Sequence, residues 1–206
     1  MTYDTLADDL AAVIEQTGAQ DATLVGFLMG GGEVARYMSR HSGKRVKQTV
    51  LISSVVPYML KTSDNPDGVD QSVFDEMAKG IKDDRAKFWS SFFKDFFGVG
   101  LVSHPVSNEV LEWARSVSRQ AGLKPTLACA KAFASADFRG DLALFTVPTL
   151  IIHGTADKTV PINISGRKAA QGIPHTKLIE YVGAPLGLFA SHKNQLIADV
   201  IKFLTD

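Results

Sequence analysis

Apolar residues follow two alternating patterns along the chain. Short segments with an apolar centre, which are typical of strands in a parallel sheet, occupy residues 22–27, 46–54, 147–153 and 177–182. Around them, apolar residues recur every three or four positions, which predicts helices with one buried face. Strands that alternate with helices indicate an α/β fold with a parallel sheet of about four strands, flanked by helices.

Capping residues and glycines mark the ends of the predicted helices. The first helix is expected to begin at a cap formed by Asp4 or Thr5 and to end at Gly18. The other helices that belong with the sheet are expected over residues 33–38, 164–171 and 187–204.

The pattern changes between residues 55 and 141. Prolines and glycines interrupt this region, and its amphipathic stretches are rich in aromatic side chains, with six aromatic residues among the ten of 88–97. We interpret residues 55–141 as a helical cap over a pocket, inserted into a core formed by residues 1–54 and 142–206. A helix on a membrane surface is the alternative for residues 88–97, but the run lacks the basic face expected of one.

Composition and charge exclude several classes of function. The 206 residues carry 22 basic and 22 acidic side chains, so no net charge would attract nucleic acid or an acidic membrane. No apolar run approaches about 20 residues, so no membrane-spanning helix is expected. The acidic start of the chain argues against a signal peptide. A single cysteine, Cys129, excludes an internal disulfide, and we expect a cytoplasmic protein.

The segment from Gly26 to Gly30 has the frame of a nucleophile elbow, Gly-x-Ser-x-Gly, between a predicted strand and a predicted helix. The two glycines suit a strained turn that presents the side chain at position 28 at the top of the sheet. The backbone N–H of Met29, at the start of the helix, would face a developing oxyanion. Position 28 is Leu28, however, and an alkyl side chain has no lone pair with which to attack a carbonyl.

Four segments, in this order, resemble the bacterial cofactor-free haloperoxidase and arylesterase family of α/β hydrolases: residues 23–37, 132–138, 147–161 and 183–190. The resemblance implies that Leu28 stands at the position of the nucleophilic serine, Asp157 at that of the triad acid, and Leu186 at that of the triad histidine. It also implies a small ester or carboxylic acid as ligand, with ester hydrolysis and peracid formation as the reactions. We expect no cofactor and no metal, since the sequence has no metal-ligand spacing and no phosphate or dinucleotide motif.

The resemblance begins at the helix before residues 22–27, so the family's first four strands would be absent from the chain. The loop that supplies the family's second oxyanion N–H would then be missing too. The strand Ala22–Phe27 would form a new edge of the sheet. Because a buried apolar strand left at an edge tends to pair, we expect self-association or a partner chain to cover it.

These departures favour a catalytically inactive fragment or engineered variant of an esterase or perhydrolase, with a structural or scaffold role. Loss of nucleophile and base together lowers the rate of a triad enzyme by about 10⁶-fold, so esterase activity should be near background. Two alternatives stay open. One is an active hydrolase completed by strands from another chain, and the other is a module that binds a small apolar ligand under the aromatic cap.

Other side chains with catalytic potential are interpreted as structural. Ser53 and Ser54 end a strand, where a serine hydroxyl usually bonds to the backbone, and Cys129 lies among alanines of the cap. His153 is expected to form a structural hydrogen bond at the end of its strand. With no histidine to orient, Asp157 should take another hydrogen-bond partner.

Overall fold

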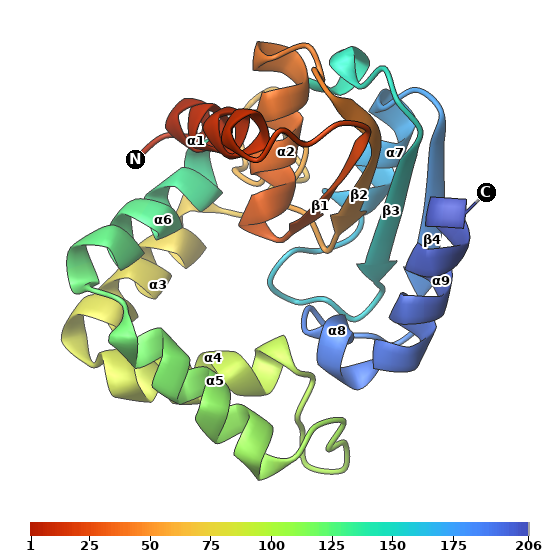
Figure 1. Ribbon diagram of the computed structural model, residues 1–206. Coiled ribbons are helices and arrows are strands. Elements are labelled where there is room, and N and C mark those ends of the chain that lie inside the picture. Colours follow the sequence, from red (N-terminus) through yellow and green to blue (C-terminus); the bar gives the residue numbers. More distant parts are fainter. Residues whose placement is uncertain (206) are drawn as a thin grey trace.

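The apolar runs form one parallel sheet with the strand order β1-β2-β3-β4 in the computed structural model of the protein, which describes residues 1–205 (Figure 1). The strands are β1 (Ala22–Phe27), β2 (Val46–Ile52), β3 (Thr149–Gly154) and β4 (Thr176–Tyr181). Val25 of β1 is opposite Val50 of β2, and Ile151 of β3 is opposite both Leu51 of β2 and Leu178 of β4. The predicted parallel α/β sheet is therefore confirmed, with β1 at one of its edges.

The inner strands are apolar on both faces because helices cover both. One face packs against α1 (Tyr3–Gln16), α2 (Met29–Arg40) and α7 (Gly166–Gly172), and its core includes Leu51 and Ile151. The other face packs against α8 (Leu188–Ser191) and α9 (Lys193–Thr205), over Val50 and Ile152. All six residues of β3 are buried, which explains why its sequence does not alternate with polar side chains.

Three helix ends differ from the prediction. The cap of α1 is Thr2, whose hydroxyl accepts the backbone N–H of Thr5 at 3.2 Å, so the expectation of a cap at Asp4 or Thr5 was wrong. Asp4 lies instead in the first turn, where a carboxylate interacts favourably with the helix dipole. Helix α2 begins at Met29, well before residue 33, and the closing helix is interrupted at His192 between α8 and α9.

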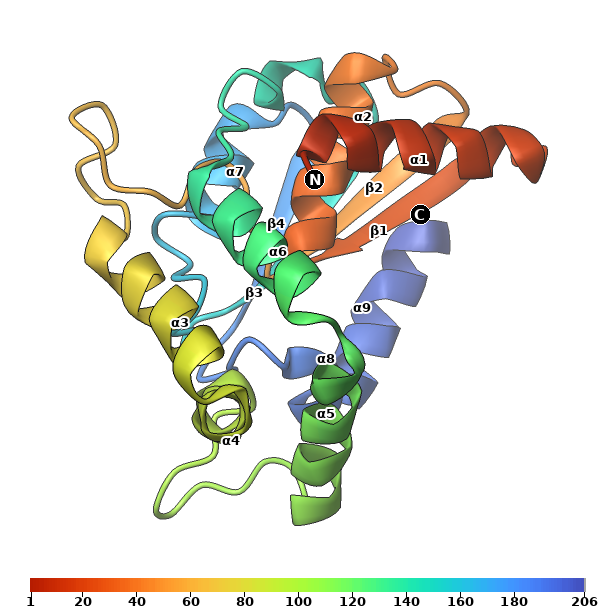
Figure 2. The ribbon, with the colours of Figure 1, turned by 90° about the vertical axis from the view of Figure 1, so that its left-hand side faces the viewer.

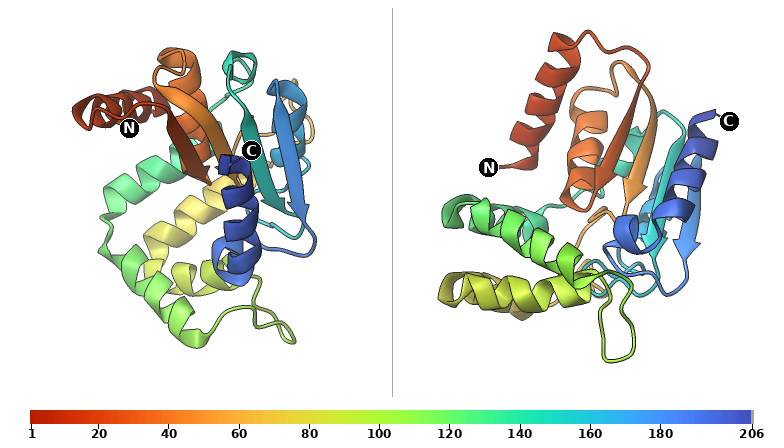
Figure 3. Two further views of the ribbon diagram at one scale, coloured as in Figure 1. Left: turned by 45° about the vertical axis from the view of Figure 1, so that its right-hand side comes forward. Right: turned by 60° about the horizontal axis from the view of Figure 1, so that its bottom comes forward.

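Four helices occupy the region between β2 and β3. They are α3 (Gln71–Asp83), α4 (Arg85–Phe96), α5 (Asn108–Gln120) and α6 (Leu123–Ser135), followed by a short 3₁₀ turn, Leu142–Leu144. Figures 2 and 3 show these helices as a lobe beside the end of the sheet at which the strands terminate. Helices α3 and α6 lie together, as do α4 and α5. The division into a core and a cap stays a prediction about domains, and Asp206, the last residue of the predicted core, lies outside the described residues.

The aromatic run of α4 forms a continuous cluster of rings. Trp89 packs edge-on against Phe92 at 5.4 Å between ring centroids and stacks on Phe93 at 5.7 Å. Phe93 and Phe96 are buried in the main apolar cluster, so the run packs α4 against the rest of the molecule. None of the helices within residues 1–205 is long and apolar enough to cross a membrane.

Candidate functional site

Leu28 occupies a strained turn between β1 and α2. Its backbone has φ 50° and ψ −113°, a conformation that a residue with a side chain seldom adopts. Three hydrogen bonds hold it there: the Leu28 N–H donates to the carbonyl of Ile52 at 3.1 Å, and the Leu28 carbonyl accepts from Gly31 and Val55 at 3.2 and 3.3 Å. The turn that would present a nucleophile is thus fully formed, although the side chain that it presents is an alkyl group.

Glycines make this turn sterically feasible. A Cβ atom on Gly26 would lie 2.5 Å from the carbonyl oxygen of Gly30, and a Cβ on Gly31 would overlap the side chain of Ser54. A Cβ on Gly30 would meet nothing within 4 Å. The close approach between strand and helix therefore requires Gly26 and Gly31, whereas the Gly30 of the sequence motif is not required by packing.

Met29 is the first residue of α2 and half-buried beside Leu28. The first backbone N–H groups of a helix have no partner within the helix. The Met29 N–H is thus of the kind that could stabilise negative charge next to position 28. Its role as an oxyanion donor stays a prediction.

Asp157 lies in the loop after β3 and is buried. Its Oδ1 atom accepts the backbone N–H groups of Thr159 and Val160 at 3.0 and 2.8 Å. Its Oδ2 atom has no hydrogen-bond partner among the described residues, and Nε2 of His153 lies 3.4 Å from it. The expectation that Asp157 takes another partner is met for one carboxylate oxygen and not for the other.

Leu186 lies in the loop between β4 and α8 and is 1% exposed. Two hydrogen bonds position this loop: Gly187 N–H donates to the carbonyl of Phe96 in α4 at 2.7 Å, and Ala156 N–H donates to the carbonyl of Ala184 at 3.0 Å. The loop of Leu186 is therefore attached both to α4 and to the loop of Asp157.

Leu28, Asp157 and Leu186 follow β1, β3 and β4, and the carboxyl ends of parallel strands meet at one end of a sheet. Ligands of parallel α/β proteins bind at this end. Leu28 and Leu186 pack into the same apolar core. The structure thus places all three positions at one end of the sheet, as the resemblance implies, but their catalytic roles are untested by this placement.

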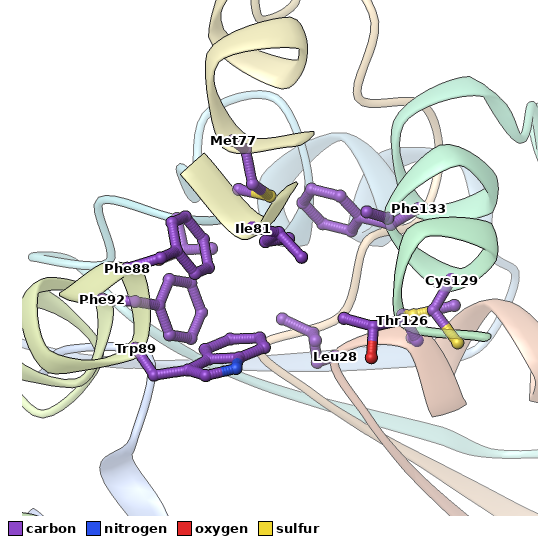
Figure 4. Close-up of a pocket in the computed structure, with 12 residues that line it drawn as sticks. Leu28, Met77, Ile81, Phe88, Trp89, Phe92, Thr126, Cys129 and Phe133 are labelled. Atoms are coloured by element: carbon purple, nitrogen blue, oxygen red, sulfur yellow. The ribbon is translucent and has the colours of Figure 1, made fainter. Parts of the chain in front are cut away.

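A cavity of about 140 Å³ lies directly over Leu28 (Figure 4). Its lining comes from the elbow, three cap helices and the Asp157 loop: Leu28, Met29, Met77, Ile81, Phe88, Trp89, Phe92, Thr126, Cys129, Ala130, Phe133 and Thr159. Neither Asp157 nor Leu186 lines it. The cap side chains were not identified one by one from the sequence, because the lining combines residues that are far apart along the chain.

Of the other candidate side chains, Ser54 and His153 form the expected hydrogen bonds to the backbone, whereas the expectation was wrong for Ser53. The Ser54 hydroxyl accepts the backbone N–H of Val56 at 3.2 Å, whereas the fully buried Ser53 hydroxyl has no partner within residues 1–205. Nε2 of His153 lies 2.8 Å from the carbonyl of Val160 and donates to it, which is the expected structural hydrogen bond. Cys129 lines the cavity from α6. In the described part of the chain, no three His, Cys, Asp or Glu side chains are grouped to hold a metal ion.

Comparison with known proteins gives a consistent result. A family model described as the alpha/beta hydrolase fold matches residues 1–185. The chain is 37% identical over 206 residues to a non-heme chloroperoxidase of Kitasatospora aureofaciens, covering 98% of this chain and 74% of that protein. It is 38% identical over 203 residues to a bifunctional esterase/perhydrolase of Acinetobacter calcoaceticus, covering 98% and 73%. The structure of a bromoperoxidase from Bacillus anthracis superimposes with a TM-score of 0.96 at 40% identity, over 100% of this chain and 75% of that one.

Proposed function

The chain belongs to the α/β-hydrolase fold family, and from this premise we propose that it is a catalytically inactive esterase- or haloperoxidase-like member with a structural role. The observation that carries the proposal is the pair Leu28 and Leu186 in a frame that keeps the elbow turn and the buried Asp157. An alkyl group cannot attack a carbonyl or accept a proton. The elbow conformation and the buried Asp157 therefore remain without the two groups that would use them.

Hydrolysis of p-nitrophenyl acetate tests this proposal. The expected rate for the protein equals that of its Asp157→Ala variant, because no histidine is present at position 186 for the carboxylate to orient. Both rates should equal the background rate of a Leu28→Ala variant. This variant is a control because alanine, like leucine, has an alkyl side chain and offers no nucleophile at the elbow. Turnover that Asp157→Ala abolishes would contradict the proposal and support an active hydrolase completed by another chain.

A second candidate function, the binding of a small apolar molecule, is favoured by the cavity over Leu28. Its volume is about 140 Å³ and its lining is almost entirely hydrocarbon, aromatic or sulfur. An apolar cavity of about 150 Å³ in another protein stays dry and binds benzene. A site of this size and lining therefore fits one aromatic ring or a short alkyl chain.

Thermal unfolding with a panel of short esters, fatty acids and aromatic compounds tests the binding function. We expect compounds with one ring to raise the melting temperature, since a ligand that binds only the folded state stabilises it. Ala130→Phe, which places a ring into the cavity, should remove the shift. If no compound raises the melting temperature, the binding function fails and only the structural role remains as a proposal.

A further inference from the structure

A surface loop of the helical lobe presents two adjacent aliphatic side chains to solvent. Residues 97–107 connect α4 to α5, and Leu101 and Val102, at the tip of this loop, are 101% and 98% exposed. The Gly100 N–H donates to the carbonyl of Ser103 at 2.9 Å, which closes a turn around these two residues. Figure 3 shows the loop protruding beyond the helices beside it. Leu101 and Val102, together the apolar tip, therefore take no part in the core of the protein.

Both ends of this loop are fixed. Phe97 is buried, and the Val99 N–H donates to the carbonyl of Lys94, in the last turn of α4, at 2.8 Å. At the other end, the Ser107 hydroxyl accepts the N–H of Val110 at 3.3 Å and caps α5. A tip held between two fixed ends keeps its side chains in water, and their burial requires a surface outside the chain.

The surroundings of the apolar tip favour a lipid surface as that partner. The loop contains no Asp, Glu, Lys or Arg residue. The helix turns beside it carry one base, Lys94, and two acids, Asp95 and Glu109, so no excess of positive charge would attract acidic headgroups. The tip offers only roughly 200 Å² of apolar surface, whereas each partner of a stable protein complex buries about 800 Å². Acyl chains need no such area, because they take up single apolar side chains.

We propose that the apolar tip docks the protein on the surface of a lipid bilayer, with Leu101 and Val102 inserted at the boundary between headgroups and acyl chains. Insertion to this depth leaves the backbone of the turn among hydrated headgroups, so its polar groups keep water as a partner. Apolar burial alone drives the attachment, which is therefore weak, reversible and independent of the charge of the lipid. The attachment depends neither on the cavity over Leu28 nor on any catalytic role.

Co-sedimentation of the full chain with phosphatidylcholine vesicles tests the proposal through the partition coefficient. We expect binding that stays the same when phosphatidylserine is added to the vesicles or when the salt concentration is raised. The double substitution Leu101→Ser and Val102→Ser should lower the partition coefficient at least about tenfold, since burial of one such side chain already has an effect of that size. Leu144→Ser, the matched control, should leave it unchanged. Leu144 is 47% exposed in the 3₁₀ turn before β3, at the opposite end of the sheet from the lobe.

A second measurement locates the tip in the lipid. A tryptophan introduced by Val102→Trp should be quenched by vesicles of brominated phosphatidylcholine beyond the quenching of the parent protein. A tryptophan introduced by Leu144→Trp should add no such quenching. This comparison decides on its own if the double substitution lowers the melting temperature and so weakens the fold, an effect that we do not expect for side chains without contacts.

Loss of vesicle binding by the double variant, at an unchanged melting temperature, supports the proposal. No binding of the parent protein to phosphatidylcholine would overturn it, as would an equal loss with Leu144→Ser. Binding that requires acidic lipid and disappears in salt would show attraction by charge, and the proposal of apolar insertion would fail. If the double variant has a lower mass than the parent protein in light scattering, the tip joins two copies of the chain, which also overturns docking on lipid.

Discussion

Leu28 keeps a backbone conformation that no longer serves a nucleophile. Such a conformation raises the free energy of the folded state by about 1–3 kcal/mol and persists only where the surroundings enforce it. Here the hydrogen bonds to Ile52, Gly31 and Val55 enforce it. The strain is a property of the turn, and it remains whichever side chain is attached at position 28.

This strain predicts an inverted order of stability for two variants at position 28. Leu28→Ala removes the side chain and keeps the strain, whereas Leu28→Gly removes both, since glycine adopts positive φ freely. We expect the glycine variant to be more stable than the alanine variant by about 1 kcal/mol in urea unfolding. At an ordinary position inside a helix or strand, the glycine variant is less stable than the alanine variant by about 0.5–1 kcal/mol. Greater stability of Leu28→Ala would show that the turn is relaxed in solution.

Asp157 permits a second prediction at the scale of one residue. Its Oδ1 atom accepts two backbone N–H groups, while Oδ2 has no partner among the described residues. Asp157→Ala leaves both N–H groups unsatisfied and should destabilise the protein by about 2 kcal/mol. Asp157→Asn keeps an oxygen for them and should lower stability by less than about 1 kcal/mol. Urea unfolding at pH 7 gives both values. Equal losses would indicate that the charge at Oδ2 has a partner in solution.

At the scale of elements, the sheet was predictable because each strand has a short apolar centre that can be recognised from the sequence alone. Predicted and observed strand bounds differ by no more than two residues at either end, as for β2, which ends at Ile52 and not at 54. The helix starts were less predictable, because Thr2 caps α1 from a position with little apolar pattern around it. The break at His192 leaves no signal in the spacing of apolar residues.

Only those parts of the candidate site that lie in sequence motifs could be predicted. Positions 28, 157 and 186 each lie in a recognisable loop after a strand. The cavity depends instead on how α3, α4 and α6 pack over the sheet, and nothing local in the sequence reports that packing. That the N–H of Trp89 has no hydrogen-bond partner within residues 1–205 follows only from the neighbours of its ring.

Arg139 connects two loops in the region between β2 and β3, and this connection gives a pH-dependent prediction. Arg139 pairs with Asp137 at 2.6 Å and with Asp64 at 2.9 Å, and its guanidinium lies 4.9 Å from the ring centre of Tyr58. The hydrogen bond from Arg139 is the main cause that holds the pKa of Asp137 below its ordinary value. A carboxyl whose pKa is lowered by folding contributes stability above its unfolded pKa, and that contribution is lost as the pH falls through the folded pKa.

We therefore expect the protein to be more stable than its Asp137→Asn variant at pH 7, and this difference to vanish in acid. The advantage should be below about 1 kcal/mol, because both side chains are more than a third exposed. Urea unfolding of the two proteins from pH 7 down to pH values below about 3.9, the ordinary pKa of aspartate, measures the difference. A difference that stays constant through the acid range would show that the ion pair does not stabilise the fold.

At the scale of the whole molecule, β1 ends the sheet with a row of backbone groups that no other described strand pairs (Figure 1). Val25, at its centre, is 54% exposed. Free apolar edges of this kind pair with other strands. Charged residues usually protect such an edge, and the six residues Ala-Thr-Leu-Val-Gly-Phe of β1 contain none.

A second copy of the chain is the partner we expect at this edge. Two β1 strands related by a twofold axis would pair antiparallel around Val25, and the same surface would serve both copies. Light scattering should then give twice the mass of one chain at micromolar concentration. Val25→Lys, which places a charge at the centre of the edge, should give the monomer. Val73→Lys is the matched control, because Val73 is 49% exposed on α3, and it should leave the dimer intact. A monomeric parent protein, or dissociation by both substitutions, would contradict pairing through β1.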